Sequence, residues 1–133
     1  MRLYMHGVWL YIWAMSNCLT GADLKELGTA MLGGFDQRIA RIPKDLSGPF
    51  HQEARQLEVE LLTIYKVTVL YVRKEQDLKA ISEAWGGMVS VCDEVAAKLN
   101  ALSKAHPSCG AESYYDRVLD LRNKCNRLQM MHA

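Results

Sequence analysis

One short segment of the chain carries a thiol and an imidazole close together. His106 and Cys109 share the segment AHPSCG, and Asp116 follows soon after it. A nucleophilic thiol needs a base to take its proton and a third group to orient that base, and loops often carry such groups. His106 and Cys109 are therefore the candidate catalytic residues of a small enzyme. The competing interpretation, which we favour, is a plain turn built around Pro107 and Gly110.

The four cysteines are Cys18, Cys92, Cys109 and Cys125. They contain no C-x-x-C pair, so no zinc knuckle or thioredoxin motif is indicated. Cys92 and Cys125 both fall on apolar helical stripes, about 20 Å before and after the turn near residues 107–110, so they should be neighbours in the core. We favour two reduced thiols that pack as small hydrophobic side chains. A disulfide is the alternative, although packed helices are about 8–10 Å apart, which is wide for its Cα separation.

The remaining patterns argue against a metal, a cofactor or nucleic acid as a ligand. The Glu-x-x-His motif of di-iron bundles does not occur, nor does a Gly-rich phosphate loop, a G-x-S-x-G motif or a Rossmann fingerprint. With 16 Lys and Arg against 15 Asp and Glu, the net charge of +1 gives no electrostatic reason to bind nucleic acid. We expect no metal, no cofactor and no nucleic-acid partner.

Helices must position these residues, because apolar side chains recur at steps of three and four along most of the chain. Half of the 133 residues are hydrophobic, which suits a single domain with a real core. The spacing predicts helices at about 20–42, 48–74, 77–104 and 111–131. The sequence therefore predicts an all-α fold: an up-down four-helix bundle over residues 20–133, with an additional apolar N-terminal segment at 1–19.

Two stretches leave an alternative open. Ile64–Val72 reads IYKVTVLYV, which is rich in strand-forming residues. We favour a helix, because no Gly or Pro between Phe50 and Trp85 would bound a strand. The polar run Arg73–Asp77 is predicted to turn the chain between the second and third helices. Nothing in that run forbids a helix, so one continuous helix of about 80 Å over 48–104 is the alternative.

The third predicted helix has a second face made of small side chains. Gly87 lies inside that helix, where a glycine costs about 1 kcal/mol relative to alanine. It belongs to a row beside the main apolar stripe, the small-residue row, made of Ala80, Ala84, Gly87 and Val91. We predict that this row, together with Trp9 and Trp13, is a contact surface for the N-terminal segment, another subunit or a partner. The alternative interpretation is that Gly86 and Gly87 cause a kink or local flexibility in this helix.

The N-terminal segment contains an uncharged apolar run, LYMHGVWLYIWAM, at residues 3–15. The run is too short for a membrane span, which needs about 20 apolar residues. It has the outline of an export signal, and Met15–Cys18 resembles a bacterial lipoprotein cleavage site, although Asn17 stands where Gly, Ala or Ser is usual. The other interpretations are an ordinary packed segment and an upstream extension before a true start at Met15.

By elimination, the sequence favours a non-catalytic helical-bundle interaction or structural protein. We expect it to be cytoplasmic and to bind a protein partner or a second copy of itself. One alternative is a small enzyme that acts through His106 and Cys109. Another is an exported protein with a lipid anchor at Cys18, and only a signal or anchor of this kind would bring the chain to a membrane.

Overall fold

Four helices make up the computed structural model, which describes residues 20–132. They are α2 (Gly21–Ala40), α3 (Ser47–Lys74), α4 (Leu78–Ala105) and α5 (Ala111–Met131), and residues 20–132 contain no strand. The predicted all-α four-helix bundle is confirmed, with bounds that agree to within the one or two residues by which helix ends vary. Both alternatives for the middle of the chain are wrong: residues 64–72 are helical, and the chain turns at 75–77.

Local hydrogen bonds explain where the helices begin. Thr20 and Asp23 form a capping box, in which the Asp23 amide donates to Thr20 Oγ1 at 3.1 Å and the Thr20 amide donates to Asp23 Oδ2 at 2.9 Å. Asp77 caps α4 by accepting from the Lys79 amide at 3.0 Å. Gly110 precedes α5 with φ +79°, a left-handed conformation that a residue without Cβ adopts at little cost.

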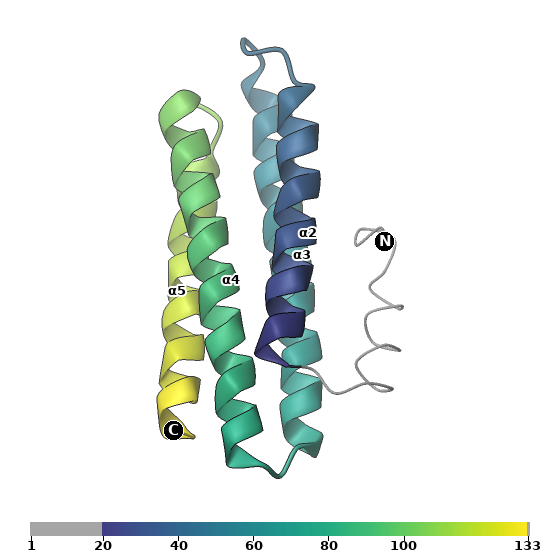
Figure 1. The fold of residues 1–133 in the computed structure, drawn as a ribbon. Coiled ribbons are helices and arrows are strands. Elements are labelled where there is room, and N and C mark those ends of the chain that lie inside the picture. Colours follow the sequence, from purple (N-terminus) through teal and green to yellow (C-terminus); the bar gives the residue numbers. More distant parts are fainter. Residues whose placement is uncertain (1–19, 133) are drawn as a thin grey trace.

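The helices alternate in direction along the chain, but neighbours in space are not all antiparallel. In Figure 1, α2 and α4 run one way and α3 and α5 run the other. α2 packs against α3 and α4, α5 packs against α4 and α3, α3 also packs against α4, and α2 and α5 barely touch. Two pairs of parallel helices, α2/α4 and α3/α5, are therefore in contact.

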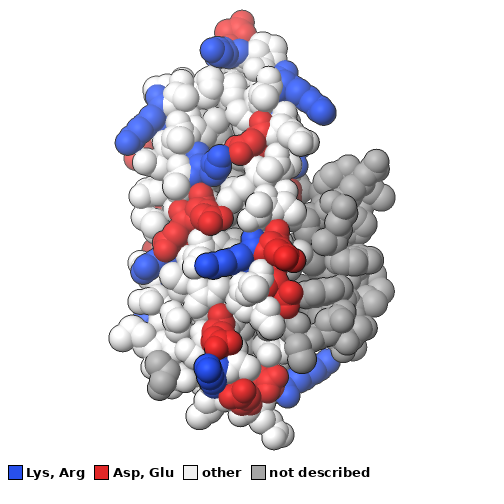
Figure 2. Space-filling model, in the orientation of Figure 1, with Lys and Arg blue, Asp and Glu red and all other residues white. Residues whose placement is uncertain are grey.

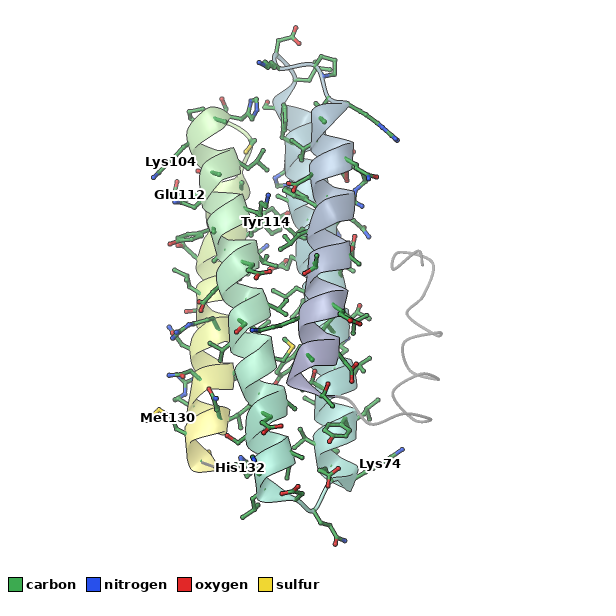
Figure 3. All side chains as sticks on the ribbon, viewed as in Figure 1. Lys74, Lys104, Glu112, Tyr114, Met130 and His132 are labelled. Atoms are coloured by element: carbon green, nitrogen blue, oxygen red, sulfur yellow. The ribbon has the colours of Figure 1, made fainter. Side chains whose placement is uncertain are left out.

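All four helices contribute to one core. Phe50 of α3 and Leu24 of α2 are 1% and 0% exposed, and Tyr114 of α5 turns inward while Lys104 and Glu112 point away from the bundle (Figure 3). The other large side chains buried to this degree are Met31, Leu57, Leu61, Ile64, Val67, Met88, Val91, Val95 and Leu99. Burial of this kind is the main favourable term in the stability of the bundle.

The outer surface carries charges of both signs. On the face shown in Figure 2, Lys and Arg alternate with Asp and Glu rather than gathering by sign. Several of these charges form ion pairs between helices, such as Lys98 Nζ with Asp36 Oδ2 at 2.8 Å. No helix within residues 20–132 combines the length and the apolar character that a membrane crossing requires.

Candidate functional site

The small-residue row forms the seam between α2 and α4. Ala84 is 0% exposed, Val91 is 1% exposed and Gly87 is buried, while Ala80 at the end of the row is half-buried. A Cβ at Gly87 would lie 3.0 Å from the Cα of Gly21, which is closer than ordinary van der Waals contact. The row therefore permits close approach, as predicted.

The helix that approaches belongs to the same chain. Gly28 of α2 faces Val91 so closely that a Cβ at position 28 would lie 2.9 Å from Val91 Cγ2. The prediction that Ala84, Gly87 and Val91 are open to another subunit or a partner is wrong, because α2 already covers them. Trp9 and Trp13, predicted to share that surface, lie outside the described residues.

The two candidate catalytic residues lie in one turn but take part in packing. Cys109 is 1% exposed, and its amide donates to the carbonyl oxygen of His106 at 3.0 Å. The His106 ring is stacked on Phe50, with ring centroids 3.7 Å apart and planes at 21°. Within residues 20–132 no hydrogen bond joins the thiol of Cys109 to the imidazole. The buried thiol is therefore not accessible to a substrate from solvent. The His106 side chain packs on the first turn of α3 through Phe50.

A chain of polar contacts joins the start of α5 to α3. The hydroxyl of Tyr114 lies 3.3 Å from His51 Nε2, and the guanidinium of Arg117 lies over the Tyr114 ring, 4.4 Å from its centroid. Arg117 Nε and Nη2 donate to the two carboxylate oxygens of Glu58 at 2.6 and 3.1 Å. This carboxylate raises the pKa of Arg117. The bidentate pair fixes α5 beside α3 with a defined geometry.

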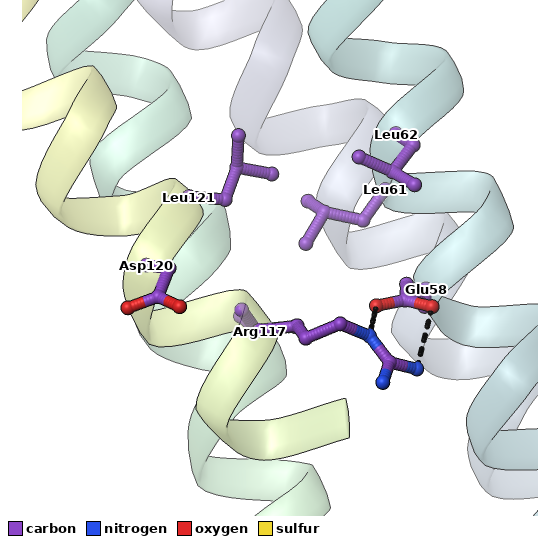
Figure 4. A pocket seen from close by; sticks show the side chains of 7 residues that line it. Glu58, Leu61, Leu62, Arg117, Asp120 and Leu121 are labelled. Atoms are coloured by element: carbon purple, nitrogen blue, oxygen red, sulfur yellow. Dashed lines mark hydrogen bonds and ion pairs between the residues drawn. The ribbon is translucent and has the colours of Figure 1, made fainter. Parts of the chain in front are cut away.

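Next to this pair, an open apolar cavity of about 330 Å³ lies between α3 and α5. We call it the α3/α5 groove, and its lining residues are Glu58, Leu61, Leu62, Arg117, Val118, Asp120 and Leu121. In Figure 4, Leu61 and Leu62 face Leu121 across the groove, while Arg117 reaches over to Glu58. Leu62 is 39% exposed, and the neighbouring Val59 is 49% exposed. The groove thus offers apolar side chains to a ligand.

Aromatic and basic side chains follow the groove one helical turn further along. The ammonium of Lys124 lies 5.3 Å from the centroid of the Tyr65 ring, and Tyr65 packs against Trp85 with centroids 5.9 Å apart. The buried indole N–H of Trp85 has no acceptor in the described part of the chain. Because Tyr65 follows Leu62, and Lys124 follows Leu121, by one turn each, this cluster lies beyond the groove along the same pair of helices.

A second, polar cavity of about 760 Å³ lies between α2 and α3. Arg38 lines it and donates to Glu53 at 2.8 Å and to Glu60 at 3.3 Å, and Gln56 also donates to Glu60 at 3.2 Å. Because two carboxylates already share the one guanidinium, Arg38 is not available to an anionic ligand. Burial raises the pKa of Glu60, and the hydrogen bonds from Gln56 and Arg38 only partly oppose that effect. This network joins two helices.

The raised pKa of Glu60 predicts a pH-dependent stability. The folded chain holds the proton of Glu60 at a higher pH than the unfolded chain, whose pKa is close to 4.5, so this residue makes the bundle less stable as the pH rises from 4.5 through the raised value. Glu60→Gln keeps an acceptor for Arg38 and Gln56 but removes the titration. We expect urea unfolding between pH 4 and 7.5 to show that the free energy of unfolding of the variant, relative to that of the parent chain, increases as the pH rises. A relative free energy of unfolding that decreases over this range would contradict this.

Comparison with protein-family models, with curated proteins and with solved structures finds no match to this chain. The geometry of the chain itself must therefore indicate its function. Of these two cavities, the polar one is lined by charged side chains that already pair with one another, while the α3/α5 groove exposes the apolar side chain of Leu62. The groove is the candidate functional site, and the periodicity of the sequence alone did not single it out.

Proposed function

We propose that this chain is a non-catalytic helical-bundle protein that binds an amphipathic helix of a protein partner in the α3/α5 groove. The observation that carries the proposal is an open, apolar groove between two parallel helices, with Leu62 39% exposed at its edge. Apolar side chains that remain exposed beside a hollow are a common mark of a binding site. The seam between α2 and α4 cannot serve this purpose, because the chain fills it.

A helix fits the shape and spacing of the groove. Leu62 on one wall and Leu121 on the other reach the surface of a hollow along two parallel helix axes, and its lining also includes the buried Leu61 and Val118. A partner helix can place side chains at i, i+3 or i+4, and i+7 between such walls. The volume of about 330 Å³ is at the low end of small-ligand pockets, which suits a few apolar side chains better than a large cofactor.

The charges at the groove indicate which helix would fit. Arg117 and Glu58 neutralise each other in a bidentate pair. Asp120 is exposed and forms no ion pair within residues 20–132. We therefore expect the partner helix to carry a Lys or Arg beside its apolar side chains, placed to meet Asp120. Such a contact at the rim sets orientation more than affinity.

The proposal includes a cytoplasmic location. It is supported by Cys92, Cys109 and Cys125, which are unpaired in the described structure. Proteins of the reducing cytosol usually keep their cysteines in this form.

The test uses a displayed library of 18-residue amphipathic helices as the probe, selected against the full chain. We expect the selected peptides to share apolar residues at i, i+3 or i+4, and i+7 with an adjacent basic residue. Leu62→Lys should weaken their binding by about 10-fold or more, since a central apolar contact is lost, and Asp120→Lys should weaken it by less. Leu78→Lys is the matched control, because Leu78 is 61% exposed at the start of α4, outside the groove lining.

Two results would overturn the proposal. One is a library that yields no binder, or binders that Leu62→Lys and Leu78→Lys affect equally. The other is a dimer of the parent chain, measured by light scattering, that Leu62→Lys dissolves, because the groove would then bind a second copy. Thermal unfolding of each variant confirms that a loss of binding is not a loss of folding.

A further inference from the structure

The rims of the α3/α5 groove carry unpaired charges that change sign along it. On α5, Asp120 lines the groove and Lys124 follows it by one turn, and both side chains are exposed. On α3, Lys66 follows Leu62 by one turn and is also exposed. None of these three charged side chains forms an ion pair within residues 20–132. Along the groove, an acidic position is therefore followed by a basic one.

The two lysines lie at nearly the same level of the bundle. α3 and α5 run in the same direction (Figure 1), and two contacts, Glu58 with Arg117 and Tyr65 with Lys124, indicate the same register between them. Both helices rise by about 1.5 Å per residue, so Lys66 lies within one residue of the level of Lys124. The Lys124 ammonium lies 5.3 Å from the centroid of the Tyr65 ring, which places this charge beside α3.

The other end of the groove has no such polarity. Arg117 and Glu58 neutralise each other in their bidentate pair. Beyond that pair, the rims carry one exposed charge of each sign, Arg55 on α3 and Asp116 on α5. A bound helix would therefore meet its strongest electrostatic contrast between Asp120 and the two lysines.

We propose that the partner helix binds antiparallel to α3 and α5 and carries an acidic residue one turn before its basic residue, so that the acidic side chain meets Lys124 and the basic one meets Asp120. This inference rests on the proposed function and deepens it, since it gives the charge pattern and the direction of the helix that the groove accepts. Complementary charges at an interface fix register and exclude wrong partners more than they add affinity.

Two physical effects favour the antiparallel direction. Because α3 and α5 are parallel, their macrodipoles point the same way along the groove, and a helix that runs the other way sets its positive end beside their negative ends. In such a helix, the residue that meets Lys124 precedes the residue that meets Asp120 by one turn. An acidic residue at i and a basic residue at i+4 is also the order that stabilises the bound helix itself. A parallel helix would need the reverse order, which stabilises a helix less.

The experiment uses two versions of the tightest 18-residue peptide from the library. They differ only in the order of one Glu and one Lys, placed four residues apart beside the apolar face. We expect the full chain to bind the version with Glu first about 5-fold more tightly, as two exposed ion pairs allow. This preference should shrink in about 1 M salt, where charges are screened beyond about 3 Å.

The direction of the helix is measured with a nitroxide spin label on the N-terminus of the peptide with Glu first. In the ¹⁵N-labelled full chain, we expect the label to broaden the amide signals of residues 124–131 more strongly than those of residues 111–117. A label on the C-terminus of the same peptide should give the opposite pattern.

A charge-swapped chain is the matched control. Asp120→Lys combined with Lys124→Asp keeps the net charge and leaves the apolar lining unchanged, and both positions are exposed. This variant should lose the preference for the peptide with Glu first. Thermal unfolding checks that the variant is folded.

Three results would overturn this inference and leave the proposed function standing. The first is equal binding of the two peptides by the parent chain. The second is an N-terminal label that broadens residues 111–117 instead. The third is a preference for Glu first that persists in the charge-swapped chain. A library that yields no binder at all would overturn the proposed function itself, and this inference with it.

Discussion

Replacing Gly87 with leucine is expected to destabilise the bundle by about 3 kcal/mol, the upper part of the range for overpacked cores. Gly87 is buried in the seam between α2 and α4. Even a Cβ there would lie 3.0 Å from the Cα of Gly21 and 3.0 Å from Leu24 Cδ1. Backbone cannot give way as a flexible side chain can, so the two helices must separate. The better helix propensity of leucine offsets less than about 1 kcal/mol of this cost.

The matched control is the same substitution at Gly33. That glycine also lies inside a helix, but nothing lies within 4 Å of a Cβ placed on it. Gly33→Leu should therefore leave stability unchanged or raise it by less than about 1 kcal/mol, through helix propensity alone. The measurement is the urea midpoint of each variant at constant slope. Equal effects at the two positions would mean that α2 does not pack on the small-residue row.

Replacing Phe50 with alanine is expected to cost about 3–5 kcal/mol. Phe50 is 1% exposed in the first turn of α3, and its ring is stacked on His106 at the end of α4. Its loss would leave a cavity where the α4–α5 turn packs onto α3, and the rigid helices around it could close only in part. Phe50→Leu fills most of that volume and should cost less than about 1.5 kcal/mol.

The same pair of variants tests the role of His106. If His106 packs on Phe50 as the structure has it, His106→Ala should cost stability, and much less so when Phe50 is already alanine. A double-mutant cycle measures that coupling. A Phe50→Ala variant that unfolds at nearly the same urea concentration as the parent chain would contradict the packing described for this end of the bundle.

The helices could be predicted from the sequence because their determinants are local. Apolar spacing sets the buried face, and the capping residues Thr20 and Asp77 mark helix starts in the sequence itself. The sequence leaves two alternatives for the end of α3, for a physical reason. The carboxylate of Glu75 accepts the amides of Gln76 and Asp77, each at 3.1 Å, which also lowers its pKa. A glutamate does this only when the backbone already turns, so its presence does not predict the turn.

The candidate site was harder to predict, because periodicity tells which face is buried but not which helix covers it. The small-residue row predicts a surface for close packing, but the pattern does not show that the helix packed on it belongs to the same chain. The complementary signal was present in Gly21 and Gly28, which lie on one face of α2. The α3/α5 groove depends on which helices become neighbours. The positions of Leu62 and Leu121 in the sequence do not predict the groove, because it exists only where α3 and α5 are neighbours.

The central claim, that the α3/α5 groove is where this chain binds a helix, is tested most directly by nuclear magnetic resonance. The full chain is labelled with ¹⁵N and titrated with the tightest amphipathic peptide from the library. We predict that the amide shifts concentrate at residues 58–62 and 117–121 and vanish in Leu62→Lys. Shifts that concentrate instead along the seam of α2 and α4, or that persist in Leu62→Lys, would contradict the claim.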